Sequence, residues 1–166
     1  MDRLILFRHA KAESEAASGD DFDRPLAGRG RKEAKAMGEH LAALGFKVDL
    51  ALVSPALRTR ETWEIAEEAG LPGAELKLVP TLYNADAGVI RRLAEAEGEG
   101  RATVVVVGHN PGLRDLAVRL LREEGSGGAL LNRAQRDFPP AAVAVFDIDT
   151  QGRATAEGVY FPERKA

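Results

Sequence analysis

The sequence predicts an α/β protein with three layers: a mainly parallel sheet, helices on both faces, and an antiparallel hairpin at its C-terminal edge. Strand-like and helix-like stretches alternate along most of the chain, which is the order of a parallel sheet with crossover helices. The strongest strand, TVVVV at 103–107, is the β-branched run of a strand buried on both faces. Near the C-terminus, the stretches 141–149 and 154–161 flank Thr150, Gln151 and Gly152, which predicts the hairpin.

The predicted parallel strands are short apolar runs at 4–7, 49–53, 76–79 and 103–107, of which 76–79 is the weakest. We expect one domain over residues 1–166. The length of 166 residues with 45% hydrophobic side chains suffices for one buried core and is short for two.

Helical spacing of apolar and small residues lies between these runs. In 31–44, Ala34, Met37 and Leu41 recur every three or four positions, and Gly45 follows as a stop. The preceding GRGRKE resembles a dinucleotide-binding glycine loop but lacks the third glycine and a preceding strand, so it is interpreted as a helix start. The same spacing predicts helices over 56–69, 86–97 and 112–122.

Two stretches have the composition of loops within the fold. Residues 13–28 are rich in Ser, Gly and Asp. Residues 123–140 contain Gly125, Gly127, Gly128 and the pair Pro139-Pro140. Both are predicted to be irregular, and no role is assigned to the second.

Composition limits the classes of function. The 23 Lys and Arg against 26 Asp and Glu give a formal net charge of −3, so no overall attraction to nucleic acid or to a membrane surface is expected. The absence of cysteine excludes disulfides, thiolate metal sites and a cysteine nucleophile. No run approaches the roughly 18 apolar residues of a membrane span, and the N-terminal run is short for a secretory signal. We expect a cytoplasmic protein of undetermined oligomeric state.

Chemically active residues follow three of the predicted strands. Arg8 and His9 end the first, and His109 follows the fourth in GHNPG. After the second strand, Ser54-Pro55 starts a helix that carries Arg58 and Thr62. Ligands bind beyond the carboxyl ends of strands in open sheets, so we expect these residues to share a site. The third histidine, His40, is interpreted as a solvated or helix-packing residue.

Each of these residues also has an ordinary structural interpretation. A lone histidine after a strand is usually a turn residue, and Arg58 could be one more charge on a helix face, as Arg60 is interpreted to be. The position of Arg58 in the first turn, where backbone donors are free, favours a phosphate contact. The pair of histidines with the two arginines is therefore read as one phosphate site.

Two guanidinium groups and an imidazole can bind a phosphoryl group without a metal or another cofactor. A histidine nucleophile must be neutral, and neighbouring arginines should lower the pKa of His9. We expect a backbone carbonyl in the following loop to accept a hydrogen bond from its other ring nitrogen. His109 is expected to be protonated and to donate to phosphate, so the two rings should have opposite protonation preferences.

These residues carry a resemblance to a known family. The Arg-His-small triplet, the Ser-Pro-x-x-Arg-x-x-x-Thr segment and the late Gly-His look like the histidine phosphatase superfamily, also called phosphoglycerate mutase-like. RHAKAE, DRPLAGRGRKEAKAMG and GHNPG resemble its SixA-like branch of phosphohistidine phosphatases. The resemblance implies that His9 becomes phosphorylated, that Arg8 and Arg58 hold the phosphoryl oxygens, and that His109 completes the pocket. Asn110 matches the pattern of the branch and is expected to bind phosphate too.

The sequence departs from the superfamily at two places. Ala10 stands where glycine is commoner, which is tolerable if the backbone φ there is negative. Larger members have a glutamate general acid in a segment that here reads TLYNADAG, where Asp86 is the nearest carboxylate. Asp86 is expected to cap a helix, and a role as proton donor is the alternative. Arg24 either lines the pocket rim or pairs with Asp23.

We therefore expect a metal-independent phosphatase, a hydrolase that works through a phosphohistidine on His9. Phosphohistidine on a partner protein is the favoured substrate, because its nitrogen leaves more readily than an alcohol and the short chain lacks room for a large lid. The alternatives are a small-molecule phosphomonoesterase and a noncatalytic phosphate-binding module.

Overall fold

Six strands form one sheet in the order β3-β2-β4-β1-β5-β6 in a computed structural model of the chain, which describes residues 1–125 and 128–163. The parallel strands are β1 (Arg3–Arg8), β2 (Leu50–Val53), β3 (Glu75–Leu78) and β4 (Thr103–Gly108). Strand β5 (Val143–Ile148) is antiparallel to β1, and β6 (Ala154–Tyr160) pairs antiparallel with β5 at the edge. The predicted sheet and its C-terminal hairpin are confirmed.

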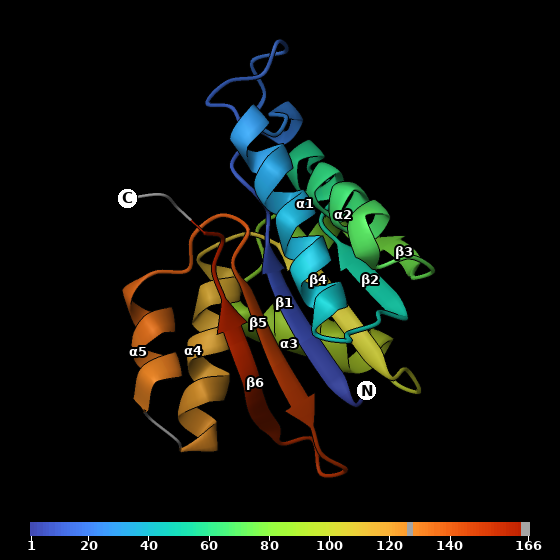
Figure 1. The fold of residues 1–166 in the computed structure, drawn as a ribbon, viewed down its shortest axis with the longest axis vertical. Helices are drawn as coiled ribbons and strands as arrows, with labels where there is room; N and C mark the ends of the chain where they lie inside the picture. The colour runs from blue at the N-terminus through green and yellow to red at the C-terminus, as the bar shows by residue number, and fades with distance from the viewer. Residues whose placement is uncertain (126–127, 164–166) are drawn as a thin grey trace.

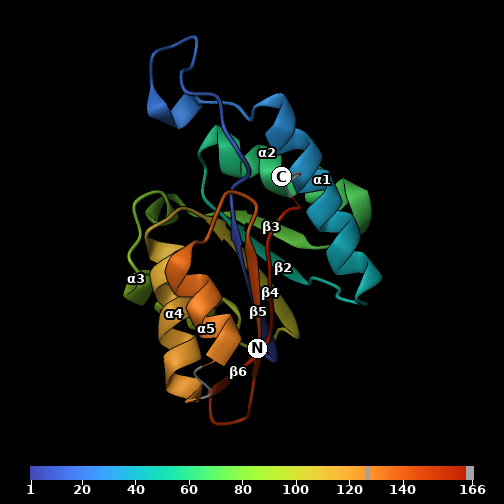
Figure 2. The ribbon, with the colours of Figure 1, turned by 60° about the vertical axis from the view of Figure 1, so that its left-hand side comes forward.

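Helices cover both faces of the sheet, as predicted (Figures 1 and 2). On one face lie α1 (Gly28–Ala43) and α2 (Leu57–Gly70). On the other lie α3 (Ala87–Glu97), α4 (Gly112–Glu124) and α5 (Gly128–Arg136). A hydrophobic core lies on each face of the sheet, and alternate residues of β1 point into one or the other. Leu4 and Leu6 pack on the α3–α4 side, whereas Ile5 and Phe7 pack against the α1–α2 side. None of the helices in the described ranges is both long and apolar enough to cross a membrane.

The two helices α1 and α2 approach each other closely at a glycine. A Cβ atom added to Gly38 of α1 would lie 2.5 Å from the Ala66 carbonyl oxygen of α2, a distance that no packing tolerates. Only glycine lets the two backbones come this near. The contact holds α2, which carries Arg58, against α1.

The prediction that residues 123–140 form a loop is wrong for most of its length. Helix α4 continues to Glu124, and α5 fills 128–136; residues 126 and 127, with the predicted loop glycine Gly127, lie outside the described residues. Two of the misleading glycines lie at helix ends: Gly125 takes a φ of 74° directly after α4, a common helix stop, and Gly128 is the first residue of α5. After Gly128, the stretch ALLNRAQR is rich in helix formers, and its Ala134 is fully buried. The other predicted loop, 13–28, is irregular apart from the short 3-10 helix η1 (Asp21–Asp23), a single bridge between Ala12 and Leu26, and Gly28, which begins α1.

The strand register brings the predicted site together. Phe7 of β1 pairs with Val107 of β4, which pairs in turn with Val53 of β2. The residues that follow these three positions therefore leave the sheet at one end. The loop between β1 and α1 rises above the same end in Figure 1.

Candidate active site

Two histidine rings meet at this end of the sheet. The ring centroids of His9 and His109 lie 5.4 Å apart, tilted by 55°. His109 Nε2 lies 2.8 Å from Ser54 Oγ, so the ends of β1, β2 and β4 all contribute to one site. The convergence expected from the order of strands and motifs is present.

The tautomer of His9 follows from its backbone contact. His9 Nδ1 lies 2.7 Å from the Ala10 carbonyl oxygen. A carbonyl can only accept, so Nδ1 carries the proton and Nε2 keeps its lone pair. His9 is only 8% exposed, and burial, assisted by the charge of Arg8, lowers its pKa to about 3 although the hydrogen bond to Ala10 raises it. The expected neutral ring and its carbonyl partner are both found, but burial rather than the arginines is the main cause.

Thr62 connects this loop to α2. The Ala10 backbone N–H donates to Thr62 Oγ1 at 2.9 Å, and the Thr62 hydroxyl donates to the Arg58 carbonyl at 2.7 Å. Ala10 is fully buried, and its backbone lies outside the left-handed region, so alanine fits where glycine is commoner. Thr62 therefore positions the backbone beside His9 rather than facing a substrate directly.

Arg58 is the second residue of α2 and is 6% exposed. Its two terminal nitrogens donate to Asp21, one to the backbone carbonyl at 2.8 Å and one to the carboxylate at 3.1 Å. Its Nε atom is buried and has no hydrogen-bond partner among the described residues. The guanidinium group is thus held from one side by the loop that follows β1.

Asp21 and Tyr83 belong to the site, and the sequence analysis missed both. The Tyr83 hydroxyl donates to Asp21 Oδ2 at 2.5 Å, and the Tyr83 ring lies 5.5 Å from that of His109. Hydrogen bonds from Tyr83, Arg24 and Arg58 lower the pKa of Asp21 to about 2, so this carboxylate is ionised at neutral pH. Asp21 is one of three aspartates in DDFD, and nothing in the local pattern distinguishes it from the others.

The proposed pair of Arg24 with Asp23 is wrong. Arg24 Nε donates to Asp21 Oδ1 at 2.9 Å and its Nη1 to the Glu13 carbonyl at 2.8 Å. Asp23 instead accepts the Ser18 hydroxyl. The charge of Arg24 contributes to lowering the pKa of His109, which is consistent with a position at the pocket rim.

The expectation of opposite protonation preferences for the two histidines is also wrong. Burial, with the charges of Arg58 and Arg8, lowers the pKa of His109 to about 4, although Asp21 raises it. Both rings are therefore neutral at pH 7, because desolvation disfavours either imidazolium. A neutral imidazole carries one proton. If the Ser54 hydroxyl donates to His109 Nε2, that proton is on Nδ1, and if Nε2 donates to Ser54 Oγ, Nδ1 has none. Ser54 therefore determines whether this ring can donate to an anion.

Arg8 and Asn110 share a backbone acceptor. Arg8 Nη1 donates to the Phe138 carbonyl at 3.1 Å, and Asn110 Nδ2 donates to the same oxygen at 2.8 Å. Phe138 lies just beyond α5, within the stretch whose role the sequence left open. This stretch orients two of the predicted phosphate-binding side chains.

Two further predictions concern residues beside the site. Asp86 caps α3, because its carboxylate accepts the Val89 N–H at 2.9 Å, and its alternative role as proton donor stays a prediction. His40 is exposed on α1 and packs edge-on against Tyr160 of β6 with ring centroids 5.0 Å apart, in agreement with its interpretation as a solvated or helix-packing residue.

The arrangement combines two guanidinium groups with two neutral imidazoles in a largely desolvated setting. The guanidinium groups can match the charge of a phosphoryl dianion, and His9 Nε2 offers the lone pair that a phosphoryl acceptor needs. Within residues 1–125 and 128–163, no group of three or more His, Asp or Glu side chains is placed to hold a metal ion.

Comparison with known proteins agrees with this chemistry. The profile of the histidine phosphatase superfamily (branch 1) matches residues 4–101. An uncharacterized protein of Mycobacterium tuberculosis is 34% identical over 141 residues, which cover 85% of this chain and 86% of that protein.

Two solved structures resemble this one over nearly its whole length. A candidate phosphohistidine phosphatase SixA from Agrobacterium tumefaciens has a TM-score of 0.84 and 31% identity, covering 97% of this chain and 98% of its own. The protein histidine phosphatase SixA complexed with tungstate has a TM-score of 0.77 and 26% identity, covering 95% of each chain.

Proposed function

The chain belongs to the histidine phosphatase superfamily, branch 1, and from this membership we propose that it is a metal-independent phosphatase that works through a phosphohistidine on His9. The observation that carries the proposal is the tautomer of His9. With the proton on Nδ1 and the ring neutral, Nε2 presents a lone pair beside Arg58 and His109.

In the first step, His9 Nε2 forms a bond to phosphorus while the bond to the leaving group breaks and its electron pair departs with that group. The charge on the three equatorial oxygens is matched by Arg8 and Arg58. The Nδ1–H of His9 stays on the Ala10 carbonyl, which stabilises the positive charge that the ring gains.

In the second step, water attacks the phosphorus, the P–N bond breaks, and the electron pair returns to His9 Nε2. The proton that water loses stays with the released phosphate. The enzyme returns to its neutral starting state with no net proton uptake by His9.

We propose phosphohistidine on a protein as the substrate. The ionised Asp21 has no proton to donate to a leaving group at neutral pH. The carboxylate of Asp86 accepts the Val89 N–H and caps α3. An alkoxide leaves poorly without a proton, whereas an imidazole nitrogen leaves more readily. The similarity to a protein histidine phosphatase, SixA, supports the same substrate class.

The test compares rates on a protein that carries phosphohistidine with rates on a panel of phosphomonoesters, all in EDTA. The proposal expects the highest kcat/KM on the phosphohistidine protein and full activity in the chelator. Higher activity on a phosphomonoester would indicate a small-molecule phosphatase. Binding of phosphate without turnover of any substrate would indicate a noncatalytic module, and loss of activity in EDTA would contradict metal independence.

A further inference from the structure

Some buried nitrogen atoms of the candidate active site have no hydrogen-bond partner within residues 1–125 and 128–163, among them Arg58 Nε and His109 Nδ1. Arg58 Nε always carries a proton, because the guanidinium group does not ionise in proteins. His109 Nδ1 is a donor or an acceptor, depending on where the neutral ring carries its proton. What His109 offers an anion therefore depends on the group that contacts its other nitrogen, which is Ser54.

We propose that Ser54 is a positioning residue: its hydroxyl donates to His109 Nε2 and so places the one proton of the neutral ring on Nδ1, from which it binds a phosphoryl oxygen. The inference rests on the proposed function, because it takes a phosphoryl group as the ligand of the pocket. His109 then acts as a neutral hydrogen-bond donor and not as an imidazolium.

The surroundings of Ser54 determine the direction of this hydrogen bond. Ser54 is fully buried, so bulk water does not accept its hydroxyl proton. Its Oγ accepts the Ala56 N–H at 3.4 Å and lies 2.8 Å from His109 Nε2, which is the one acceptor for the hydroxyl among the residues that the structure describes. If Nε2 carried a proton and donated to Oγ, the hydroxyl proton would be buried without an acceptor, which destabilises a protein. Donation from Ser54 to His109 satisfies both groups.

The two partners of this hydrogen bond are held in place by the sheet and by neighbouring rings. The Ser54 N–H donates to the carbonyl of Val107 in β4 at 3.0 Å, two residues before His109. The ring of His109 packs against those of His9 and Tyr83, with centroids 5.4 and 5.5 Å away. The contact between Ser54 and His109 is thus built into the fold before any ligand binds.

The proposed tautomer gives the two histidines complementary roles. The Nδ1–H of His9 donates to the Ala10 carbonyl, which leaves the Nε2 lone pair for phosphorus. In His109, Nε2 accepts from Ser54, which leaves the Nδ1–H for a phosphoryl oxygen. A lone pair on His109 Nδ1 would instead repel that negatively charged oxygen. Arg58 Nε and His109 Nδ1 are then both buried donors, and a bound phosphoryl group supplies the acceptors that they lack.

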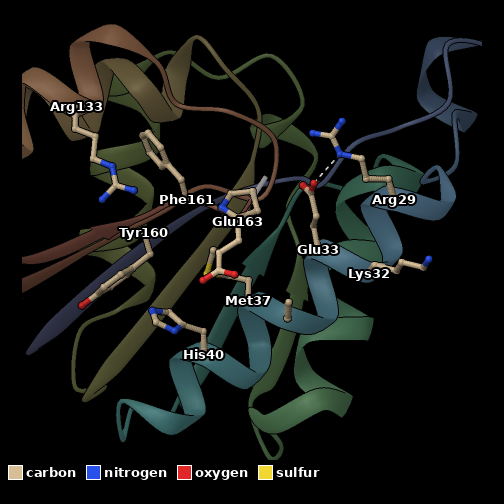
Figure 3. Close-up of a pocket in the computed structure, with 11 residues that line it drawn as sticks. Arg29, Lys32, Glu33, Met37, His40, Arg133, Tyr160, Phe161 and Glu163 are labelled. Carbon is tan, nitrogen blue, oxygen red and sulfur yellow. Dashed lines mark hydrogen bonds and ion pairs between the residues drawn. The ribbon is translucent and has the colours of Figure 1, made fainter. Parts of the chain in front are cut away.

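Nitrogen NMR of the full chain, labelled with 15N-histidine, measures the tautomer directly. The chain has three histidines, and His9→Asn and His40→Asn assign their signals by difference. His40 serves as a reference ring, because it lies against Tyr160 in a separate groove between α1 and β6 (Figure 3). At pH 7.5, His109 should have a protonated Nδ1 and an unprotonated Nε2. Addition of tungstate as a phosphate analogue should shift the Nδ1 signal.

Ser54→Ala should move His109 toward the Nε2–H tautomer, which a free histidine side chain favours in water. It should weaken tungstate binding by about tenfold, in the range of one hydrogen bond to a charged group, and lower kcat/KM on an aryl phosphate by a similar factor.

Thr59→Ala is the matched control. It removes a buried hydroxyl from the same turn, one that donates to the carbonyls of Ser54 and Ala56 and not to His109. This variant should keep the His109 tautomer and the affinity for tungstate, even if its melting temperature falls.

An Nε2–H tautomer or an imidazolium at His109 in the wild type would overturn the inference, and this measurement decides even if Ser54→Ala does not fold. An unchanged tautomer in Ser54→Ala, or equal losses of tungstate affinity in the two variants, would also overturn it. The NMR measurement needs no turnover, which separates the inference from the proposed function. A wild type that binds tungstate through His109 Nδ1–H but hydrolyses no phosphorylated substrate would refute the phosphatase and support the role of Ser54.

Discussion

At the residue scale, the site depends on keeping two imidazoles neutral among guanidinium groups. Burial does most of this work at both His9 and His109, with the charges of Arg8 and Arg58 adding to it. The hydrogen bond from Nδ1 to the Ala10 carbonyl then decides which nitrogen of His9 holds the lone pair. Burial and tautomer together make this ring suited to accept a phosphoryl group.

The lowered pKa of His9 makes the stability of the protein pH-dependent. In the unfolded chain His9 takes up a proton near its ordinary pKa of 6.5, whereas in the folded chain its pKa is about 3. Between these values the unfolded state binds more protons, so stability falls as the pH falls below 6.5. By pH 5 this one group should cost on the order of 2 kcal/mol relative to pH 7.5.

Urea unfolding of the wild type and of His9→Asn across pH 7.5 to 5 measures this contribution. The free energy of unfolding of the wild type should fall more steeply on acidification than that of His9→Asn. The difference between the two free energies should change by about 2 kcal/mol over this range. Parallel curves would show that His9 is not held neutral by the fold.

Arg58 should contribute strongly to the transition state. Arg58→Ala is expected to lower kcat/KM by about 10²- to 10³-fold, the usual loss when a preorganised charge-stabilising group is removed. Arg60→Ala is the control, since Arg60 is an exposed residue of the same helix whose Nε donates to the Pro55 carbonyl. Steady-state kinetics with circular dichroism on both variants make the comparison, and similar losses for the two would exclude a special role for Arg58.

Among the residues of the site, those carried by strand ends and by the start of a helix could be predicted. Arg8, His9 and His109 follow apolar runs, and Arg58 follows Ser54-Pro55, so their positions were readable from local pattern. Asp21 and Tyr83 could not be found in this way. They lie 62 residues apart in the chain, and each acquires its role only from the contact with the other and with Arg58. The neutral state of His109 was also missed, since burial is a property of the folded chain.

At the element scale, α2 positions the residues of the site relative to one another. It carries Arg58, and through Thr62 it supports the backbone next to His9. Its own position depends on α1, against which it packs at Gly38. Spacing of apolar residues predicted both helices, but the closeness of their contact could not be read from the periodicity.

Gly38→Ala should therefore destabilise the protein and displace α2. The added methyl group meets backbone atoms of Ala66, which cannot move as a side chain can, and overpacking of this kind costs typically 1–3 kcal/mol. Gly28→Ala is the matched control on the same helix, because a Cβ there meets nothing within 4 Å. Thermal unfolding should give a clear loss for the first variant and none for the second; equal melting temperatures would contradict the account of the packing.

Helix α5 shows where local pattern misleads. Three glycines and two prolines between 123 and 140 suggested a loop, yet Gly128 is the first residue of a nine-residue helix, and the prolines come only after its end. The segment beyond this helix supplies the Phe138 carbonyl that holds Arg8 and Asn110. Its function depends on a contact with β1 across 130 residues of sequence, which no local pattern reveals.

At the scale of the whole molecule, the alternation of strands and helices was enough to predict the layers, the parallel sheet and the end at which the site lies. The strand order β3-β2-β4-β1-β5-β6 was not readable, because it depends on which crossovers skip a strand. That order matters for function: it places β4 and β2 beside β1, and so brings His109 and Ser54 to His9.

The central claim is that this convergence makes His9 the phosphoryl acceptor. Rapid quenching during turnover of a phosphohistidine substrate, followed by mass spectrometry of peptides under alkaline conditions, tests it most directly. The account predicts an acid-labile phosphate on His9 that accumulates transiently and is absent from His9→Asn, which should also be inactive and folded. Phosphate found on a different residue, or undiminished turnover by His9→Asn, would contradict it.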